Sequence, residues 1–156
     1  MKYFSRTRWS IVVSLLILGG CFGYPKIKVS MIEGMPPKFA WQGPGKWSES
    51  PRSLYEFVVI KPKPGDHKFE DIFGSDSRTN PNVIWRIETV EGGIRFPEAP
   101  VITYGQVPVG WRQTVPASQS APTLTEGPIY FAGQPFTAQD AVLSFKLKSG
   151  VAVLNE

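Results

Sequence analysis

Cys21 has the clearest chemical context in this chain, and it is the single cysteine among 156 residues. It directly follows Gly19 and Gly20, which end an apolar run over residues 11–18 behind a basic N-terminus. A positive head, a short apolar body and small closing residues are typical of an export signal, which a peptidase removes. The run is too short to cross a bilayer, since crossing takes about 20 apolar residues. Two alternatives stay open: an uncleaved anchor, or a secretory signal that is cut elsewhere with Cys21 inside it.

The tetrad Leu18-Gly19-Gly20-Cys21 resembles the lipobox of bacterial lipoproteins. The resemblance implies a thioether-linked diacylglycerol on Cys21, cleavage between Gly20 and Cys21 that removes residues 1–20, and in many bacteria an amide-linked acyl chain. Two or more chains anchor a protein stably, because each buried CH₂ contributes about 0.8 kcal/mol and one chain is marginal. We therefore expect a lipid anchor in the cell membrane or the outer membrane. Phe22 favours the outer membrane in a Gram-negative cell, since an aspartate there typically retains lipoproteins in the inner membrane.

The charge of the chain argues against a nucleic-acid partner. The sequence has 17 Lys and Arg against 13 Asp and Glu, but three of the basic residues lie in the signal (Lys2, Arg6 and Arg8). Residues 21–156 therefore keep 14 basic against 13 acidic side chains. Nucleic-acid binding needs a clustered basic face, and the nearest basic cluster, Lys61-Pro62-Lys63-Pro64, is predicted to be a solvated turn. We expect no nucleic-acid partner.

Few residues could support catalysis. His67 is the single histidine and lies in a turn-forming stretch; without a free cysteine beside it, the three or four ligands of a metal site are missing. No serine lies on a recognisable nucleophile turn, and Ser75-Asp76-Ser77 is typical of turn residues that bond their own backbone. Glu70-Asp71 is the one adjacent acidic pair, and neighbours in sequence seldom face one cleft. We predict no metal, no cofactor and no enzymatic activity.

Aromatic side chains are the other candidates for a function, because Trp and Tyr dominate the centres of protein interfaces. Trp111 lies between Gly110 and Arg112 in a proline-rich connection, so it either contacts a partner or fixes the loop. We predict a partner contact at Trp111, Arg112 and Tyr104, and we expect Trp85 to lie in the core. A glycan-binding surface is the alternative, built from exposed aromatic side chains (Trp41, Trp47, Trp111, Tyr104 and Tyr130).

The hydrophobic pattern predicts strands as the elements that position these residues. Apolar residues at period two, or in short continuous runs, predict strands over 27–31, 54–60, 83–90, 101–104, 129–132 and 141–147, with shorter ones at 94–96 and 151–154. In the strand over 83–90, we expect Val83, Trp85 and Ile87 to face the core, and Arg86 and Glu88 to face solvent. Prolines and glycines predict irregular structure over 34–45 and a long connection over 107–128.

Short strands separated by turns, with no run of ten residues at helical period, predict an all-β fold. We expect an antiparallel β-sandwich of the immunoglobulin or fibronectin type III kind. The predicted organisation is a helical signal peptide over 1–20, a lipidated tether over 21–26 and one sandwich domain over 27–156. About 135 residues are enough for one core. With Cys21 acylated no disulfide can form, and the sequence does not indicate an oligomeric state.

A second resemblance covers residues 102–116 (ITYGQVPVGWRQTVP), preceded by VIWRIE at 83–88. This stretch is similar to a pattern in small uncharacterised bacterial envelope lipoproteins. The resemblance implies a lipid-tethered β-sandwich and adds no catalytic residue. We predict a lipid-anchored envelope protein that is a non-catalytic binding or assembly module for a protein partner. A glycan- or peptidoglycan-binding envelope domain is the alternative function.

Overall fold

The computed structural model describes residues 28–42, 53–66, 76–95, 98–135 and 142–155. Several residues singled out by the sequence lie outside these ranges: the signal, the tether with Cys21, Trp47, His67, and the pair Glu70-Asp71. In the described part of the chain every regular element is a β-strand. The same residues contain no helix that is long and apolar enough to cross a membrane.

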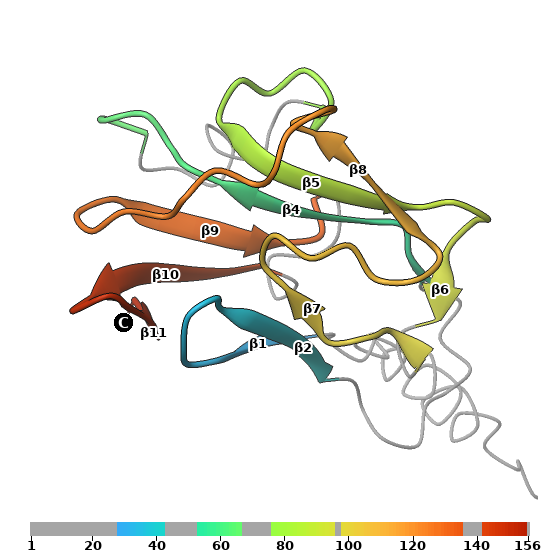
Figure 1. Cartoon of the computed structure of the whole chain (residues 1–156), viewed down its shortest axis with the longest axis horizontal. Coiled ribbons are helices and arrows are strands. Elements are labelled where there is room, and N and C mark those ends of the chain that lie inside the picture. The colour runs from blue at the N-terminus through green and yellow to red at the C-terminus, as the bar shows by residue number, and fades with distance from the viewer. Residues whose placement is uncertain (1–27, 43–52, 67–75, 96–97, 136–141, 156) are drawn as a thin grey trace, which may run out of the picture.

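Eleven strands follow one another along the described chain: β1 (Lys28–Ile32), β2 (Lys38–Gln42), β3 (Ser53–Leu54), β4 (Glu56–Ile60), β5 (Val83–Thr89), β6 (Ile94–Arg95), β7 (Ile102–Thr103), β8 (Trp111–Val115), β9 (Ile129–Gly133), β10 (Val142–Lys148) and β11 (Val151–Leu154). They form a six-stranded sheet in the order β11-β10-β9-β4-β5-β8, a three-stranded sheet in the order β1-β2-β7, and a small pairing of β3 with β6. Figure 1 shows the β1-β2-β7 sheet lying below the six-stranded sheet. The predicted antiparallel β-sandwich is confirmed.

The strand order agrees with the immunoglobulin-like arrangement. β1, β2 and β7 lie side by side as strands A, B and E do, and β10, β9, β4 and β5 follow the order G-F-C-C′ of the opposite sheet. β8 is added beside β5 and β11 beside β10. Near the start of β9, the Tyr130 hydroxyl accepts a hydrogen bond from Thr125 N at 3.0 Å and donates one to Thr125 O at 3.2 Å. This is the tyrosine corner of such folds, and it fixes the turn that leads into β9.

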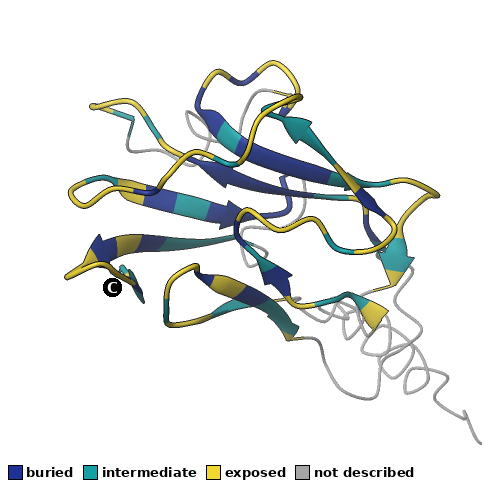
Figure 2. Ribbon diagram, viewed as in Figure 1, coloured by how far each residue is buried: buried dark blue, intermediate teal, exposed yellow. Residues whose placement is uncertain are grey.

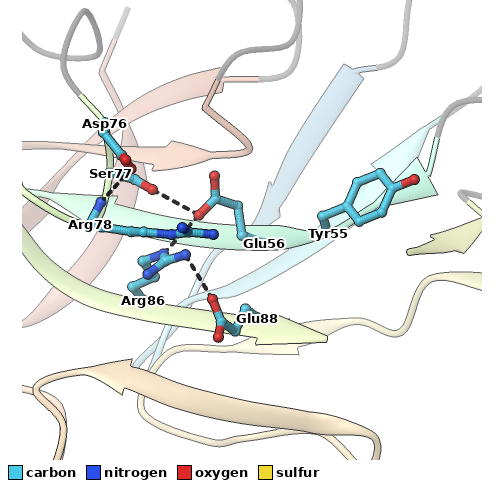
Figure 3. A pocket seen from close by; sticks show the side chains of 7 residues that line it. All are labelled: Tyr55, Glu56, Asp76, Ser77, Arg78, Arg86 and Glu88. Atoms are coloured by element: carbon cyan, nitrogen blue, oxygen red, sulfur yellow. Dashed lines mark hydrogen bonds and ion pairs between the residues drawn. The ribbon is translucent and has the colours of Figure 1, made fainter. Parts of the chain in front are cut away.

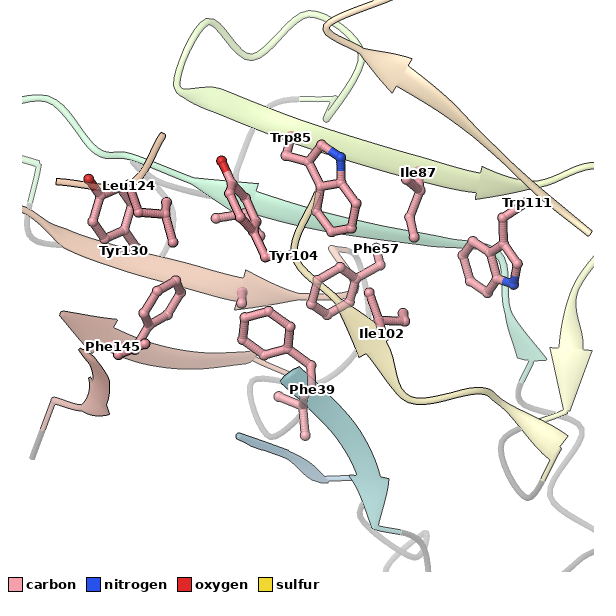
Figure 4. Close-up of a cluster of buried hydrophobic side chains, with 14 of the residues drawn as sticks. Phe39, Phe57, Trp85, Ile87, Ile102, Tyr104, Trp111, Leu124, Tyr130 and Phe145 are labelled. Carbon is pink, nitrogen blue, oxygen red and sulfur yellow. The ribbon is translucent and has the colours of Figure 1, made fainter. Parts of the chain in front are cut away.

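The core lies between the two sheets and is rich in aromatic rings (Figures 2 and 4). Phe39 on β2 is fully buried, with its ring centre 5.1 Å from that of Phe57 on β4 and 5.7 Å from that of Phe145 on β10. Trp85 on β5 is buried as predicted, and its Nε1 donates to Gln113 Oε1 at 2.8 Å. Burying a large apolar side chain contributes about 1.5–3 kcal/mol, so apolar packing holds the sandwich together.

Two strands of the structure are missing from the sequence prediction. β2 forms within the stretch expected to be irregular, because residues 38–42 pair with β1 along their whole length. β8 forms within the connection over 107–128, where it pairs with β5. Pro108 and Pro116 flank β8 and do not interrupt it, and proline is tolerated at strand ends. β6 lies within the short strand predicted over 94–96, and it pairs with β3.

The prediction for the faces of β5 is correct at Trp85 and Ile87 and wrong at Val83. For Arg86 the predicted direction is correct, but the predicted exposure to solvent is wrong. Val83 packs with Val58 and Ile60 on the opposite face, since the register between β4 and β5 shifts between Val59 and Ile60. Arg86 points away from the core as expected. It is nevertheless buried, with 5% of its surface exposed.

Tyr104, which follows β7, attaches a long loop to the core. Its ring packs at 5.2 Å from the Trp85 ring, and its hydroxyl donates to Pro122 O at 2.6 Å. Burial raises the pKa of this hydroxyl well above its ordinary value of 10, and the neighbouring Tyr130 raises it further. The folded protein therefore favours the neutral form of Tyr104.

This pKa shift predicts a loss of stability at alkaline pH. Below pH 10 Tyr104 is neutral in both states, so it adds no pH dependence. Above about pH 10 it ionises only in the unfolded chain, and the free energy of unfolding falls by up to about 1.4 kcal/mol per pH unit. Urea unfolding between pH 8 and 11 should show a shallower fall for Tyr104→Phe than for the unmodified protein. Equal slopes would contradict the assignment.

Candidate functional site

Four charged side chains gather on the outer face of the six-stranded sheet. Glu56 lies on β4, Arg86 and Glu88 lie on β5, and Arg112 lies on β8. Alternate residues of a strand point to opposite faces. Because the chain neighbours of these residues point into the core, the charged groups face outward. We call these four residues the ion-pair cluster.

Arg86 is the centre of the ion-pair cluster. Its Nε lies 2.7 Å from Glu56 Oε2 and its Nη2 lies 2.7 Å from Glu88 Oε2 (Figure 3). The other oxygen of Glu88 accepts hydrogen bonds from both Nε and Nη2 of Arg112. Glu56 Oε2 accepts a further bond from Ser77 Oγ at 2.8 Å. Two carboxylates and two guanidinium groups thus form one continuous network across three strands.

Burial differs sharply within the ion-pair cluster. The side chain of Arg86 is 6% exposed and those of Glu56 and Glu88 are 15% and 16% exposed, whereas that of Arg112 is 66% exposed. Removing one partner of a buried ion pair leaves a charge without compensation, which costs several kcal/mol. An exposed pair is worth about 1 kcal/mol or less. Removing the Arg86 side chain would therefore cost much more stability than removing that of Arg112.

An open pocket of about 510 Å³ adjoins the ion-pair cluster. Its walls come from β4, β5 and the turn over residues 76–79, and its lining residues are Tyr55, Glu56, Asp76, Ser77, Arg78, Arg86 and Glu88 (Figure 3). Asp76 shapes the turn as predicted, since its Oδ1 accepts a hydrogen bond from Arg78 N at 3.0 Å. Glu56 Oε1 accepts no hydrogen bond from any residue in the described ranges. The pocket therefore offers an acceptor held in place by Arg86.

The pocket lining combines carboxylate, guanidinium and hydroxyl groups with one aromatic ring. The Ser77 hydroxyl donates a hydrogen bond to the Glu56 carboxylate. No histidine lies among the described residues that line the pocket. Across the described ranges no group of three His, Cys, Asp or Glu side chains could hold a metal ion. Fixed carboxylate oxygens, guanidinium groups and the Tyr55 ring are suited to hydrogen bonds, ion pairs and stacking with a bound partner.

The structure separates the three residues predicted to contact a partner. Trp111 and Tyr104 are each 6% exposed and belong to the core, as Figure 4 shows. Nε1 of Trp111 is buried without an acceptor in the described part of the chain, so ring packing must outweigh that unmade bond. Arg112 faces the opposite way, into solvent beside Glu88. Of the three, only Arg112 has an exposed side chain.

The ion-pair cluster is not among the sites that the sequence predicts, although part of its signal is visible there. Glu56 stands alone in the apolar strand over 54–60, and Arg86 and Glu88 alternate with Trp85 and Ile87. That spacing predicts an outward face for both charges. It does not reveal that β4 and β5 are neighbours in the register that places Glu56 opposite Glu88.

The difference in burial predicts different losses of stability for two arginine variants. Arg86→Ala should lower the free energy of unfolding by about 3–5 kcal/mol, because two largely buried carboxylates lose their partner. Arg112→Ala, the matched control, should lower it by about 1 kcal/mol or less. Urea unfolding measures both. Equal losses would show that Arg86 is not the structural centre of the cluster.

Comparison of the chain with protein-family models, with curated proteins and with solved structures finds no match in any of the three.

Proposed function

We propose that this chain is a lipid-anchored protein of the cell envelope that binds a protein partner without catalysing a reaction. Cys21 carries the anchor, at the cell membrane or, in a Gram-negative organism, at the outer membrane. The partner contacts the outer face of the six-stranded sheet at Arg112 and the pocket beside it.

The observation that carries the partner site is the arrangement of Arg112. Its exposed guanidinium is held by two hydrogen bonds to Glu88, which Arg86 fixes in turn. Arginine and tyrosine are enriched where interfaces bind most strongly, and ordering a side chain in advance lowers the entropy cost of binding. Arg112 is such a residue, since its side chain is 66% exposed and is ordered within the ion-pair cluster.

We favour a protein partner over a glycan because of where the aromatic rings lie. A stacking surface for sugars needs rings at the surface. Trp111, Tyr104 and Tyr130 are all buried in the sandwich, and Trp41 is half-buried against Phe57. The alternative therefore loses most of the side chains on which it was based, whereas the charged pocket remains open to a peptide or protein surface.

Crosslinking in intact cells tests the partner site. A photoreactive amino acid at position 112 should capture one discrete protein. The matched control is position 146 on β10, because Lys146 is also exposed and its strand belongs to the same sheet. Capture at 146 but not at 112, or capture at neither position while the protein is folded and exported, would overturn the site.

Acylation of Cys21 is tested separately. We expect a radioactive fatty acid to label the protein and the membrane fraction to contain it. Cys21→Ser should abolish the label and release the protein from membranes, because the thioether bond needs the sulfur atom. Unlabelled protein, or a Cys21→Ser variant that keeps the label, would contradict the lipid anchor whatever the outcome of crosslinking.

A further inference from the structure

We propose that one end of the sandwich lies against the surface of the lipid bilayer. This end is formed by Tyr55, Val90, Val107 and Val109, which we call the apolar tip. The inference rests on the proposed acylation of Cys21 and adds which part of the domain meets the membrane.

The apolar tip exposes large apolar side chains next to one another. Val109 is 102% exposed, Tyr55 and Val90 are 56% exposed, and Val107 is 43% exposed. Thr89 N donates to Tyr55 O at 3.0 Å, and Val90 N donates to Gly110 O at 2.9 Å. These bonds hold the start of β4, the end of β5 and the turn before β8 together. Apolar groups gathered on an exposed surface mark a contact site.

Backbone geometry keeps these side chains outward. Gly110 has φ +80°, a conformation that favours glycine, and it ends the turn that carries Val109 into solvent. Gly93 allows the Tyr55 ring to lie against the β5–β6 turn, since a Cβ there would come within 2.8 Å of ring carbons. The turn before β8 and the β5–β6 turn therefore keep the side chains of Val109 and Tyr55 exposed.

The first described residue, Lys28, lies at the same end of the domain as the apolar tip. β1 begins at Lys28, and its next residue, Val29, pairs with Trp41. The Trp41 ring lies 5.9 Å from the ring of Phe57, two residues beyond Tyr55. In Figure 1 the β5–β6 turn and the end of the β7–β8 connection lie at this end, opposite β11. Whatever its conformation, the chain from Cys21 to Lys28 spans at most about 25 Å.

The short tether selects this end over the opposite one. Ile32, Met35 and Val151 are also exposed, but they lie at the far end of the strands. A strand of five to seven residues is roughly 17–23 Å long, so the far end reaches the bilayer only when the tether is almost fully extended and the domain is turned over. An acylated Cys21 therefore brings the apolar tip to the membrane first.

Charge near the apolar tip is balanced, which favours a contact with the membrane that needs no anionic lipid. Arg95 pairs with Glu98 at 2.6 Å. Lys28 and Glu91 are exposed and opposite in sign. An exposed tyrosine among valines is suited to the headgroup region, where Tyr is enriched. We therefore expect the contact on zwitterionic lipid and little dependence on salt.

The test uses the acylated full chain in phosphatidylcholine vesicles. With Cys21 acylated, an introduced cysteine is the one thiol available for a fluorescent label. At Val109→Cys, nitroxide-headgroup lipids should quench the label about twofold or more, because interfacial contact brings it to within about 5–10 Å of the headgroups. Val151→Cys, the same substitution at the far end, is the matched control and should stay unquenched. Slowed amide exchange in residues 107–110 on vesicles provides a readout without any label.

The outcomes separate this inference from the proposed function. Acylated, membrane-bound protein with equal quenching at 109 and 151, or stronger quenching at 151, would overturn the apolar tip alone. The same holds if residues 107–110 are protected only when a second protein is present, since the tip would then be covered by a partner. A protein that carries no acyl chain would overturn the proposed anchor, and the inference with it.

Discussion

The register of β5 determines both faces of the six-stranded sheet. On the inner face, Trp85 bonds Gln113 of β8; on the outer face, Arg86 bridges Glu56 and Glu88. A shift of one residue would exchange these faces, burying Arg86 among aromatic rings and exposing Trp85. Burying Arg86 among aromatic rings and exposing Trp85 would each cost much stability. The core and the ion-pair cluster therefore specify the same register of β5 against β4 and β8. The structural and the candidate functional parts of this sheet are therefore not separable.

Most of the fold is predictable because period-two patterns and turn residues are local signals. The strands that became β1, β4, β5, β9 and β10 were placed within one or two residues of their observed bounds. β2 and β8 were missed because each depends on pairing with a distant neighbour: Phe39 on β2 is buried against Phe57 and Phe145, which are far away in sequence. Register shifts have the same origin. The shift between Val59 and Ile60 moves Val83 to the outer face, and no local pattern announces it.

The candidate site was less predictable than the fold, for a related reason. Whether a residue such as Trp111 is exposed depends on whether its segment is a loop or a strand, and the prolines near it suggested a loop. Once β8 pairs with β5, alternation turns Trp111 inward and Arg112 outward. The ion-pair cluster could not be assembled without knowing that β4, β5 and β8 are neighbours. Partners on neighbouring strands lie up to 32 positions apart in sequence. No local pattern therefore reveals that they meet.

The start of β8 lies between the two proposed contacts, the apolar tip and the partner site at Arg112. Arg112 lies three residues beyond Val109, which limits the separation of their Cα atoms to about 10 Å. A domain whose apolar tip rests on the bilayer would therefore present Arg112 and its pocket close to the headgroups. The partner that fits such a site is one with a surface near the same membrane, either an integral protein or another anchored one. A partner that stands far from the bilayer could reach Arg112 only if the tip were lifted away, so membrane contact and partner contact constrain each other through a single strand.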